Sequence, residues 1–110
     1  IKLTAVPLKR RPRVFQRSKD TAYFDLNALK GAVLRGFKAG DVIRPMGLGG
    51  TKKIKDVLID AKVARDARAG VPLLVVGGEV AWAVGVKRGE KAGLTPESKK
   101  IVKITAAPII

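Results

Sequence analysis

One stretch decides the fold of this 110-residue chain: Pro72-Leu73-Leu74-Val75-Val76-Gly77-Gly78-Glu79-Val80-Ala81-Trp82-Ala83-Val84-Gly85-Val86. Residues 72–76 and 79–86 are short apolar runs of the length that is typical of strands. Gly77 and Gly78 stand between them, and glycine adopts the positive φ angles of a tight hairpin turn without steric cost. We therefore predict a β-hairpin here, and with it a fold built on antiparallel strands.

The clearest helical pattern lies upstream, over residues 51–62. Its apolar positions repeat at i, i+3, i+4 and i+7, which is one face of a helix: Ile54, Val57, Leu58 and Ala61. Thr51 is placed to act as the N-cap, because its hydroxyl can accept a bond from a first-turn amide. The pattern predicts one main amphipathic helix.

Further strands are predicted over residues 1–7, 32–37 and 100–105, and turn residues occupy 38–41. Residues 21–26 are expected to return to the core, and residues 64–70 to form a polar connector. The fold class is therefore α+β, mostly antiparallel strands with one main helix. We divide the chain into a basic N-terminal strand and arm, residues 1–22, and a globular domain, residues 23–110.

The charge of the chain points to a polyanionic partner. Twenty-three Lys and Arg residues against nine acids give a net charge of +14 and a pI near 10.7. Such a field attracts nucleic acid and speeds its encounter with the protein. We expect no membrane partner, because the sequence has neither an apolar run of about 18 residues nor a long helix with one basic and one bulky apolar face.

Cysteine and histidine are both absent from the sequence. This excludes disulfides, thiolate nucleophiles, Ser-His triads and the usual zinc sites, and it fits a cytoplasmic protein. No two acids are spaced as a catalytic pair. We therefore predict no catalytic residue, no metal site and no cofactor site in these 110 residues.

The segment Gly47–Lys55 combines glycines with three lysines, Lys52, Lys53 and Lys55. If it opens the predicted helix, free amides and the positive dipole end lie beside those lysines, which is a good anion site. Cations there are otherwise unfavourable, and a bound phosphate would reverse the sign. The alternative is an ordinary capped helix with solvated lysines. The segment is not a nucleotide P-loop, because Pro45 stands where that motif needs its first glycine.

Two other basic regions extend this picture. Lys62, Arg65 and Arg68 would continue a basic ridge if the helix ran on, unless nearby acids balance them: Asp56, Asp60 and Asp66. The cationic segment 8–19 is either an arm that contacts phosphates or a solvated loop.

Three single residues have an ordinary explanation. Asp41 follows Gly40 and is best read as a turn residue, and Glu79 flanks the hairpin turn. Trp82 lies in an apolar strand, where core packing is favoured over base stacking.

Because aromatic residues make up only 5% of the chain, we expect the protein to read phosphates and shape rather than stack on bases.

An ordered set of short motifs resembles the C-terminal domain of tRNA(Ile)-lysidine synthetase over roughly residues 23–88. These are Phe24-Asp25, Leu34-Arg35, Gly40-Asp41, Pro45-Met46-Gly47, residues 50–58, Lys62-Val63, Arg68, residues 71–74 and residues 80–85. The resemblance implies a β-sandwich of the kind also found in phenylalanyl-tRNA synthetase β chains.

The resemblance also implies a function. The family enzyme uses ATP, with magnesium, to adenylate the wobble cytidine of an isoleucine tRNA and then joins lysine to it. That chemistry belongs to an N-terminal domain with a pyrophosphatase loop, which these residues lack. The C-terminal domain grips the acceptor stem of the tRNA, and the full enzyme can form a homodimer.

The matching basic positions carry the expected RNA contacts: Arg35, Arg44, Lys52, Lys53, Lys55 and Arg68. We add Lys62 and Arg65 from the placement of charge alone. The chain departs from the family where it has Phe37 and Val42 in place of further arginines, and Ala64 in place of a proline. These departures leave some loop contacts and the end of the helix open.

Three rival functions remain at this point. The alternatives to the tRNA-binding module are a general basic RNA-binding domain, a protein-dimerisation domain that happens to be basic, and a small self-sufficient enzyme. The absence of His, Cys and paired carboxylates argues against the enzyme.

Overall fold

The predicted hairpin forms. A computed structural model describes residues 1–108, and in it β6 (Leu73–Val76) and β7 (Glu79–Ala83) are antiparallel neighbours. Gly77 and Gly78 both have positive φ, 57° and 79°, as the tight turn requires. The return strand is shorter than predicted, because residues 84–86 form a turn. After this turn, β8 (Lys87–Arg88) pairs back onto β7, and the sequence did not predict this strand.

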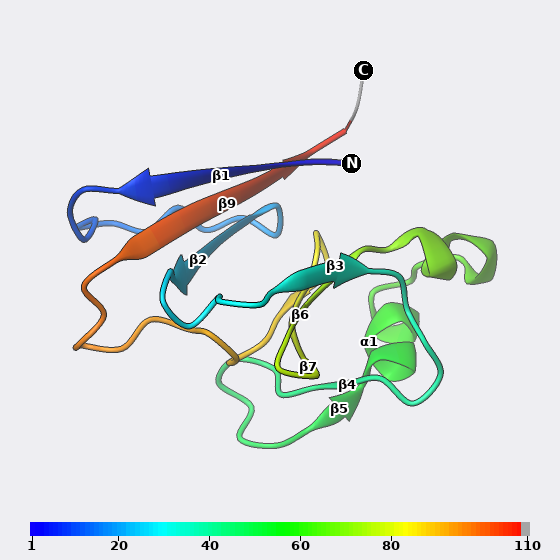
Figure 1. The fold of residues 1–110 in the computed structure, drawn as a ribbon. Coiled ribbons are helices and arrows are strands. Elements are labelled where there is room, and N and C mark those ends of the chain that lie inside the picture. Colours follow the sequence, from blue (N-terminus) through cyan, green and yellow to red (C-terminus); the bar gives the residue numbers. More distant parts are fainter. Residues whose placement is uncertain (109–110) are drawn as a thin grey trace.

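The hairpin is the centre of the larger of two sheets (Figure 1). On one side, β6 pairs with β3 (Val33–Arg35). On the other side, β7 pairs with β4 (Val42–Ile43), which pairs with β5 (Lys52–Lys53). The pairing of β4 with β7 is parallel, while the other pairs in this sheet are antiparallel.

The second sheet has three strands in the order β1-β9-β2. Here β9 (Ile101–Ala107) is central, between β1 (Lys2–Leu8) and β2 (Thr21–Asp25). Both pairings are antiparallel, and β1 pairs with β9 along its whole length. Figure 1 shows this sheet on the opposite side of the hairpin from α1 (Ile54–Asp60).

Two apolar cores result, one on each face of the hairpin. Leu74 and Val76 face the three-stranded sheet, where they join Phe24 and Val102. Leu73 and Val75 face the other way, and their cluster includes residues of α1: Ile54, Val57 and Leu58. Since successive strand residues point to opposite faces, the continuous apolar run Leu73–Val76 is what a strand covered on both sides needs.

The helix is shorter than predicted, and its start differs. It begins at Ile54, whose amide donates to the carbonyl of Asp41 at 2.9 Å, and it ends at Asp60. Lys52 and Lys53 lie in β5, because their backbone pairs with Val42 and Ile43. Thr51 is therefore not the N-cap; Lys53 takes that position without a side-chain bond.

The chain leaves the helix sharply. Lys62 has a φ of +58°, which ends the α-helical path, and residues 65–70 form a separate 3-10 helix, η1 (Arg65–Gly70). The basic ridge therefore does not run along one continuous helix.

The fold-class prediction is confirmed: the described chain is α+β, mostly antiparallel strands in two packed sheets with one α-helix. The division at residues 22 and 23 stays a prediction; it falls inside β2, and the N-terminal β1 is part of a sheet. Residues 109–110 of the expected domain 23–110 lie outside the described residues. Within residues 1–108, no helix is both long and apolar enough to cross a membrane.

Candidate nucleic-acid interface

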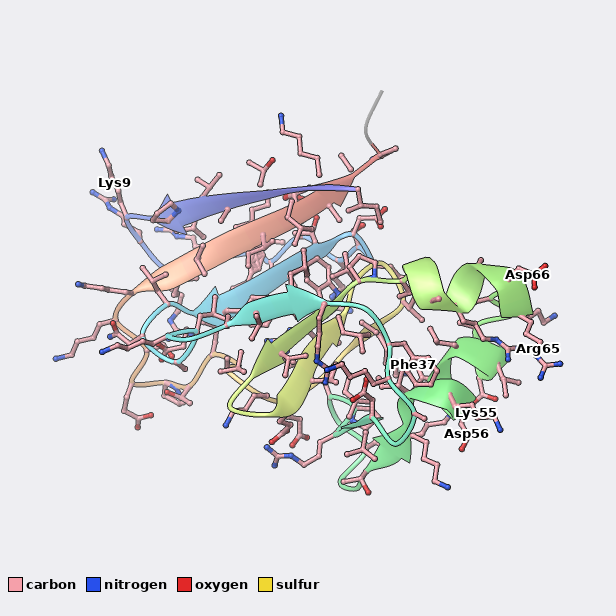
Figure 2. The ribbon with its side chains drawn as sticks, turned by 45° about the vertical axis from the view of Figure 1, so that its right-hand side comes forward. Lys9, Phe37, Lys55, Asp56, Arg65 and Asp66 are labelled. Carbon is pink, nitrogen blue, oxygen red and sulfur yellow. The ribbon has the colours of Figure 1, made fainter. Side chains whose placement is uncertain are left out.

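Four of the eight predicted contact residues lie exposed around the helix. Lys53 closes β5, Lys55 lies in the first turn of α1, Lys62 follows the helix and Arg65 opens η1. Figure 2 shows Lys55 and Arg65 on the same side of the molecule, with Asp56 and Asp66 near them. We call Lys53, Lys55, Lys62 and Arg65 the helix-side cations. These two acids reduce the net charge of this surface, which is one of the two possibilities that the sequence left open.

Three other predicted residues are ion-paired. Arg35 binds Asp41 with two hydrogen bonds of 2.9 Å, Arg44 binds Glu79 at 2.7 and 3.1 Å, and Lys52 pairs with Asp60. Each pair joins segments that are separate in the fold. These three cations therefore carry less uncompensated charge than the helix-side cations.

The Arg35–Asp41 pair also fixes a turn. The Asp41 carboxylate accepts a bond of 2.8 Å from the amide of Lys38, and only 12% of its side chain is exposed. The bond from Arg35 is the main reason that the pKa of Asp41 lies below its ordinary value. Asp41 is thus a turn residue, as predicted, with an ion pair that the sequence did not reveal.

Arg68 has a structural partner as well. Its Nε donates to the carbonyl of Val63 at 3.2 Å, and the side chain is half-buried. This bond ties η1 to the end of the preceding turn. Arg68 therefore positions the segment that carries Lys62 and Arg65.

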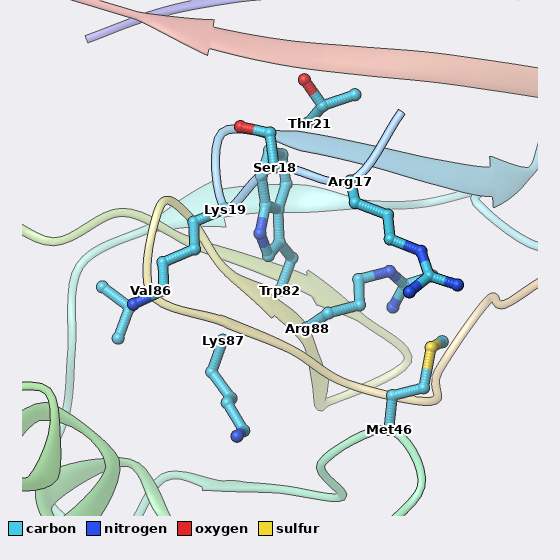
Figure 3. Close-up of a pocket in the computed structure, with 9 residues that line it drawn as sticks. All are labelled: Arg17, Ser18, Lys19, Thr21, Met46, Trp82, Val86, Lys87 and Arg88. Atoms are coloured by element: carbon cyan, nitrogen blue, oxygen red, sulfur yellow. The ribbon is translucent and has the colours of Figure 1, made fainter. Parts of the chain in front are cut away.

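The structure assembles a second group of cations that the sequence did not bring together. Arg17 and Lys19 from the N-terminal arm, and Lys87 and Arg88 from β8, line one cavity of about 440 Å³ (Figure 3). Ser18, Thr21, Met46, Trp82 and Val86 complete its lining. We call this the arm cavity. The only signal in the sequence was the excess of charge in residues 8–19, because the approach of β8 to the arm is a property of the fold.

Arg88 anchors the floor of the arm cavity. Its guanidinium donates to the carbonyls of Ala81 at 2.9 Å and Tyr23 at 3.2 Å, and it lies 3.9 Å from the ring centre of Phe24. Burial lowers the pKa of Arg88 to about 10, so the side chain stays charged at neutral pH. It joins the two sheets through a charged group.

The acids of the described residues form no metal cluster. Within residues 1–108, no three acids come together as metal ligands. Asp41 and Glu79 are both ion-paired. Trp82 is 2% exposed and packs near Phe24, with ring centres 6.2 Å apart, so core packing is its main role.

The chain is similar to known proteins over most of its length. The family model described as the TilS substrate C-terminal domain matches residues 33–104. A tRNA(Ile)-lysidine synthase of Clostridium acetobutylicum is 40% identical over 88 residues, which cover 79% of this chain and 19% of that protein. One from Geobacter sulfurreducens is 38% identical over 88 residues, 79% of this chain and 19% of that protein. The chain thus spans about a fifth of the length of these relatives.

A solved structure shares the fold. The crystal structure of a TilS C-terminal domain superposes with a TM-score of 0.82 and covers 94% of this chain and 80% of that one. The two sequences are 24% identical.

Proposed function

The chain belongs to the TilS substrate C-terminal domain family, and from this premise we propose that it is the tRNA-gripping module of a longer tRNA(Ile)-lysidine synthase. In this role it binds the acceptor stem of an isoleucine tRNA in the cytoplasm, while a separate domain joins lysine to the wobble cytidine. The observation that carries the proposal is the group of exposed helix-side cations on a chain of net charge +14.

The helix-side cations are suited to phosphates rather than to bases. They project from β5, α1, the turn after it and η1, so they span several short elements of one side of the fold. Lysine and arginine side chains on such a surface contact the backbone of a helix and fix its position, with little dependence on sequence. The other four predicted residues hold this surface in place through bonds within the protein: Arg35, Arg44, Lys52 and Arg68. They contact RNA when these bonds break.

The chemistry of the longer protein lies outside this chain. The resemblance implies ATP and magnesium for the longer enzyme, but the residues of this chain do not form a binding loop for a nucleoside triphosphate. Lys52 and Lys53 lie on a strand instead of a helix start, and Pro45 is buried where a P-loop needs glycine. We therefore assign no catalytic step to these residues.

The test reverses the charge of three helix-side cations. We expect the combined variant Lys53→Glu, Lys55→Glu, Arg65→Glu to bind an isoleucine tRNA transcript about tenfold or more weakly, at roughly 0.5–1 kcal/mol for each lost charge contact. Fluorescence anisotropy with labelled tRNA measures this, and circular dichroism checks the fold.

The matched control moves the same charge elsewhere. Lys9, Lys30 and Lys99 are exposed and lie outside the helix-side group and the arm cavity. Their combined change to Glu lowers the net charge by the same amount. Because these residues lie outside the proposed contact surface, the loss of binding free energy should be less than half of that in the helix-side variant. Equal losses in both variants would show that only the net charge matters, and that the chain is a general basic RNA-binding domain.

The dimerisation alternative has one observation in its favour. β3 is an edge strand, and its Val33 and Leu34 are half exposed. An edge strand with apolar side chains can pair with a second copy. Sedimentation equilibrium of the chain with and without tRNA distinguishes tRNA binding from dimerisation. A dimer that does not bind tRNA would support the dimerisation domain and contradict the tRNA-gripping proposal.

A further inference from the structure

We propose that the arm cavity holds one unpaired nucleotide of the RNA, with its phosphate among Arg17, Lys19 and Lys87 and its base against Phe15 and Met46. The inference rests on the proposed tRNA-binding function and deepens it. It adds a single-stranded subsite to a surface that otherwise contacts the outside of a helix.

The positive charge of the arm cavity favours a bound anion. Arg17, Lys19 and Lys87 are exposed, and no ion pair among residues 1–108 involves any of them. No acid lines the cavity. Asp20, the nearest acid along the chain to Arg17 and Lys19, lines a different hollow beside Ala106. Asp60 lines a hollow that Lys19 and Lys87 share, but it is ion-paired with Lys52. Like charges that line one cavity without an ion-pair partner repel one another, and a phosphate relieves that repulsion.

The neighbouring groups favour a phosphate ester over a bare counter-ion. Ser18 and Thr21 line the same cavity and add hydroxyl donors to the ammonium and guanidinium groups. Figure 3 shows Arg17 and Arg88 reaching toward the same part of the opening, with Lys19 and Lys87 at the other side. The donors therefore lie on two sides of an open hollow.

The arm is held in place before any ligand arrives. Arg11 donates to the carbonyl of Thr95 at 2.7 Å, and the amide of Gln16 donates to the Tyr23 hydroxyl at 3.1 Å. Lys103 donates to the side chain of Gln16 at 2.8 Å. These bonds come from distant parts of the chain and fix the segment that carries Arg17 and Lys19. Binding thus requires little further ordering of the arm.

A second hollow of about 340 Å³ adjoins the arm cavity and is mostly apolar. The two share Thr21, Met46 and Arg88, and Phe15 and Leu94 line the second one. Phe15 packs edge-on against Tyr23, with ring centres 4.9 Å apart, and 37% of the residue stays exposed. Met46 is 55% exposed. An aromatic ring beside a flexible thioether is a suitable surface for the flat face of a base.

The combination selects an unpaired nucleotide. In a duplex the bases are stacked inside, so a duplex can offer phosphates to the arm cavity but no base to Phe15. A nucleotide at a single-stranded end can present both groups at once, and single-stranded RNA is commonly bound by such stacking. The observed adjacency of a cationic and an aromatic hollow therefore indicates a strand end instead of a helix side.

The experiment compares two RNA hairpins that differ only in a short single-stranded 3′ overhang. We expect the overhang to raise the affinity for this chain about tenfold, which corresponds to the stacking of one base. Binding is measured by fluorescence anisotropy. Trp82, the single tryptophan of the chain, lines the arm cavity, so its emission gives a second readout, which should change more with the overhang RNA than with the blunt RNA.

Two variants locate the effect. Phe15→Ala should remove most of the gain from the overhang and leave blunt-hairpin binding within about twofold of wild type. The combined change of Arg17, Lys19 and Lys87 to Ala should also remove most of that gain, in addition to any uniform weakening that its lost charge causes for both hairpins. Met46→Ala gives a second test of the apolar hollow that leaves the arm untouched. The combined change of Lys9, Lys30 and Lys99 to Ala is the control for charge, and it should keep the gain.

The outcomes separate this inference from the function on which it rests. A blunt hairpin that binds, with no gain from the overhang, overturns the nucleotide subsite and leaves the gripping role intact. A chain that binds neither hairpin overturns the gripping role and, with it, the subsite. A gain that persists in Phe15→Ala and Met46→Ala places the overhang elsewhere. A free nucleoside monophosphate that binds the cavity, and that the overhang RNA does not displace, assigns the site to a small molecule and overturns the inference.

Discussion

At the scale of single residues, several charges hold the fold together. Arg88 is the clearest case, because its guanidinium bonds to carbonyls of both sheets and stacks on Phe24. Arg35 holds Asp41 in its turn, and Arg44 holds Glu79 beside the hairpin. These arginines are therefore less available to RNA than the exposed cations that have no ion-pair partner.

The Arg35–Asp41 pair should appear as pH-dependent stability. The change Asp41→Asn should lower the free energy of unfolding by about 1–3 kcal/mol at pH 7, because the bidentate bond is lost and Arg35 is left with a neutral partner. Because Arg35 holds the folded pKa of Asp41 below its ordinary value of 3.8, the pair stabilises the fold above that pH and loses its effect as pH falls through the folded value.

Urea unfolding at about pH 7 and about pH 2.5 measures this dependence. The gap between wild type and Asp41→Asn should narrow at the lower pH, because protonation of Asp41 removes the ion pair. Glu97→Gln is the control, since Glu97 is exposed in a loop and belongs to none of the ion pairs of residues 1–108. A gap of equal size at both values of pH would assign the loss to the turn geometry and not to the ion pair.

At the scale of elements, short strands determine where the functional side chains lie. β5 has only two residues, yet its pairing with β4 keeps Lys52 and Lys53 out of the helix. β8 also has two residues, and its pairing with β7 carries Lys87 and Arg88 to the arm. Pairings this short depend on close backbone approach, which Gly89 provides next to β8.

Gly89 should tolerate no side chain. An added Cβ would lie 2.8 Å from Cγ1 of Ile43 and 2.9 Å from the carbonyl oxygen of Val80. Because one of these atoms belongs to the backbone of a central strand, the clash cannot be relieved by a rotamer change. We expect Gly89→Ala to lower the free energy of unfolding by about 3 kcal/mol, measured by urea denaturation.

Gly50→Ala is the matched control for that change. Gly50 is exposed, and an added Cβ there meets nothing within 4 Å. Its substitution should change stability by less than about 0.5 kcal/mol. If both variants lost the same stability, the contact at Gly89 would not be the cause.

At the scale of the whole molecule, net charge and its distribution have separate effects on binding. The charge of +14 speeds the approach of any polyanion, whereas the placement of cations determines how many phosphates are neutralised. Salt dependence measures the second quantity, because each neutralised phosphate releases counter-ions.

The logarithm of the tRNA-binding constant should therefore fall linearly with the logarithm of salt concentration. Replacing Lys53, Lys55 and Arg65 with Ala should make the slope shallower by about 2–3, at slightly less than one for each lost phosphate contact. Anisotropy titrations between about 50 and 200 mM salt give the slope. Parallel lines for wild type and variant would mean that these side chains touch no phosphate.

The sequence by itself determined the central hairpin, the strands β1, β3 and β9, the fold class and the family. The apolar run Leu73–Val76 and the pair Gly77-Gly78 specify the hairpin through side-chain burial and backbone φ, which are local properties. The stripe of Ile54, Val57 and Leu58 specifies a helix in the same way. The ordered motifs indicated the family because they depend only on residue identity and order.

Only the tertiary structure decided which cations are free and which lie together. The start of the helix moved from Thr51 to Ile54 because β5 pairs with β4, a contact between segments that a local pattern does not contain. Arg44 pairs with Glu79, and Lys87 and Arg17 line one cavity, although each of these two pairs is far apart in the sequence. Charge is fixed by the amino-acid type, but its neighbours are fixed by how the two sheets pack, so the arm cavity exists only in the folded chain.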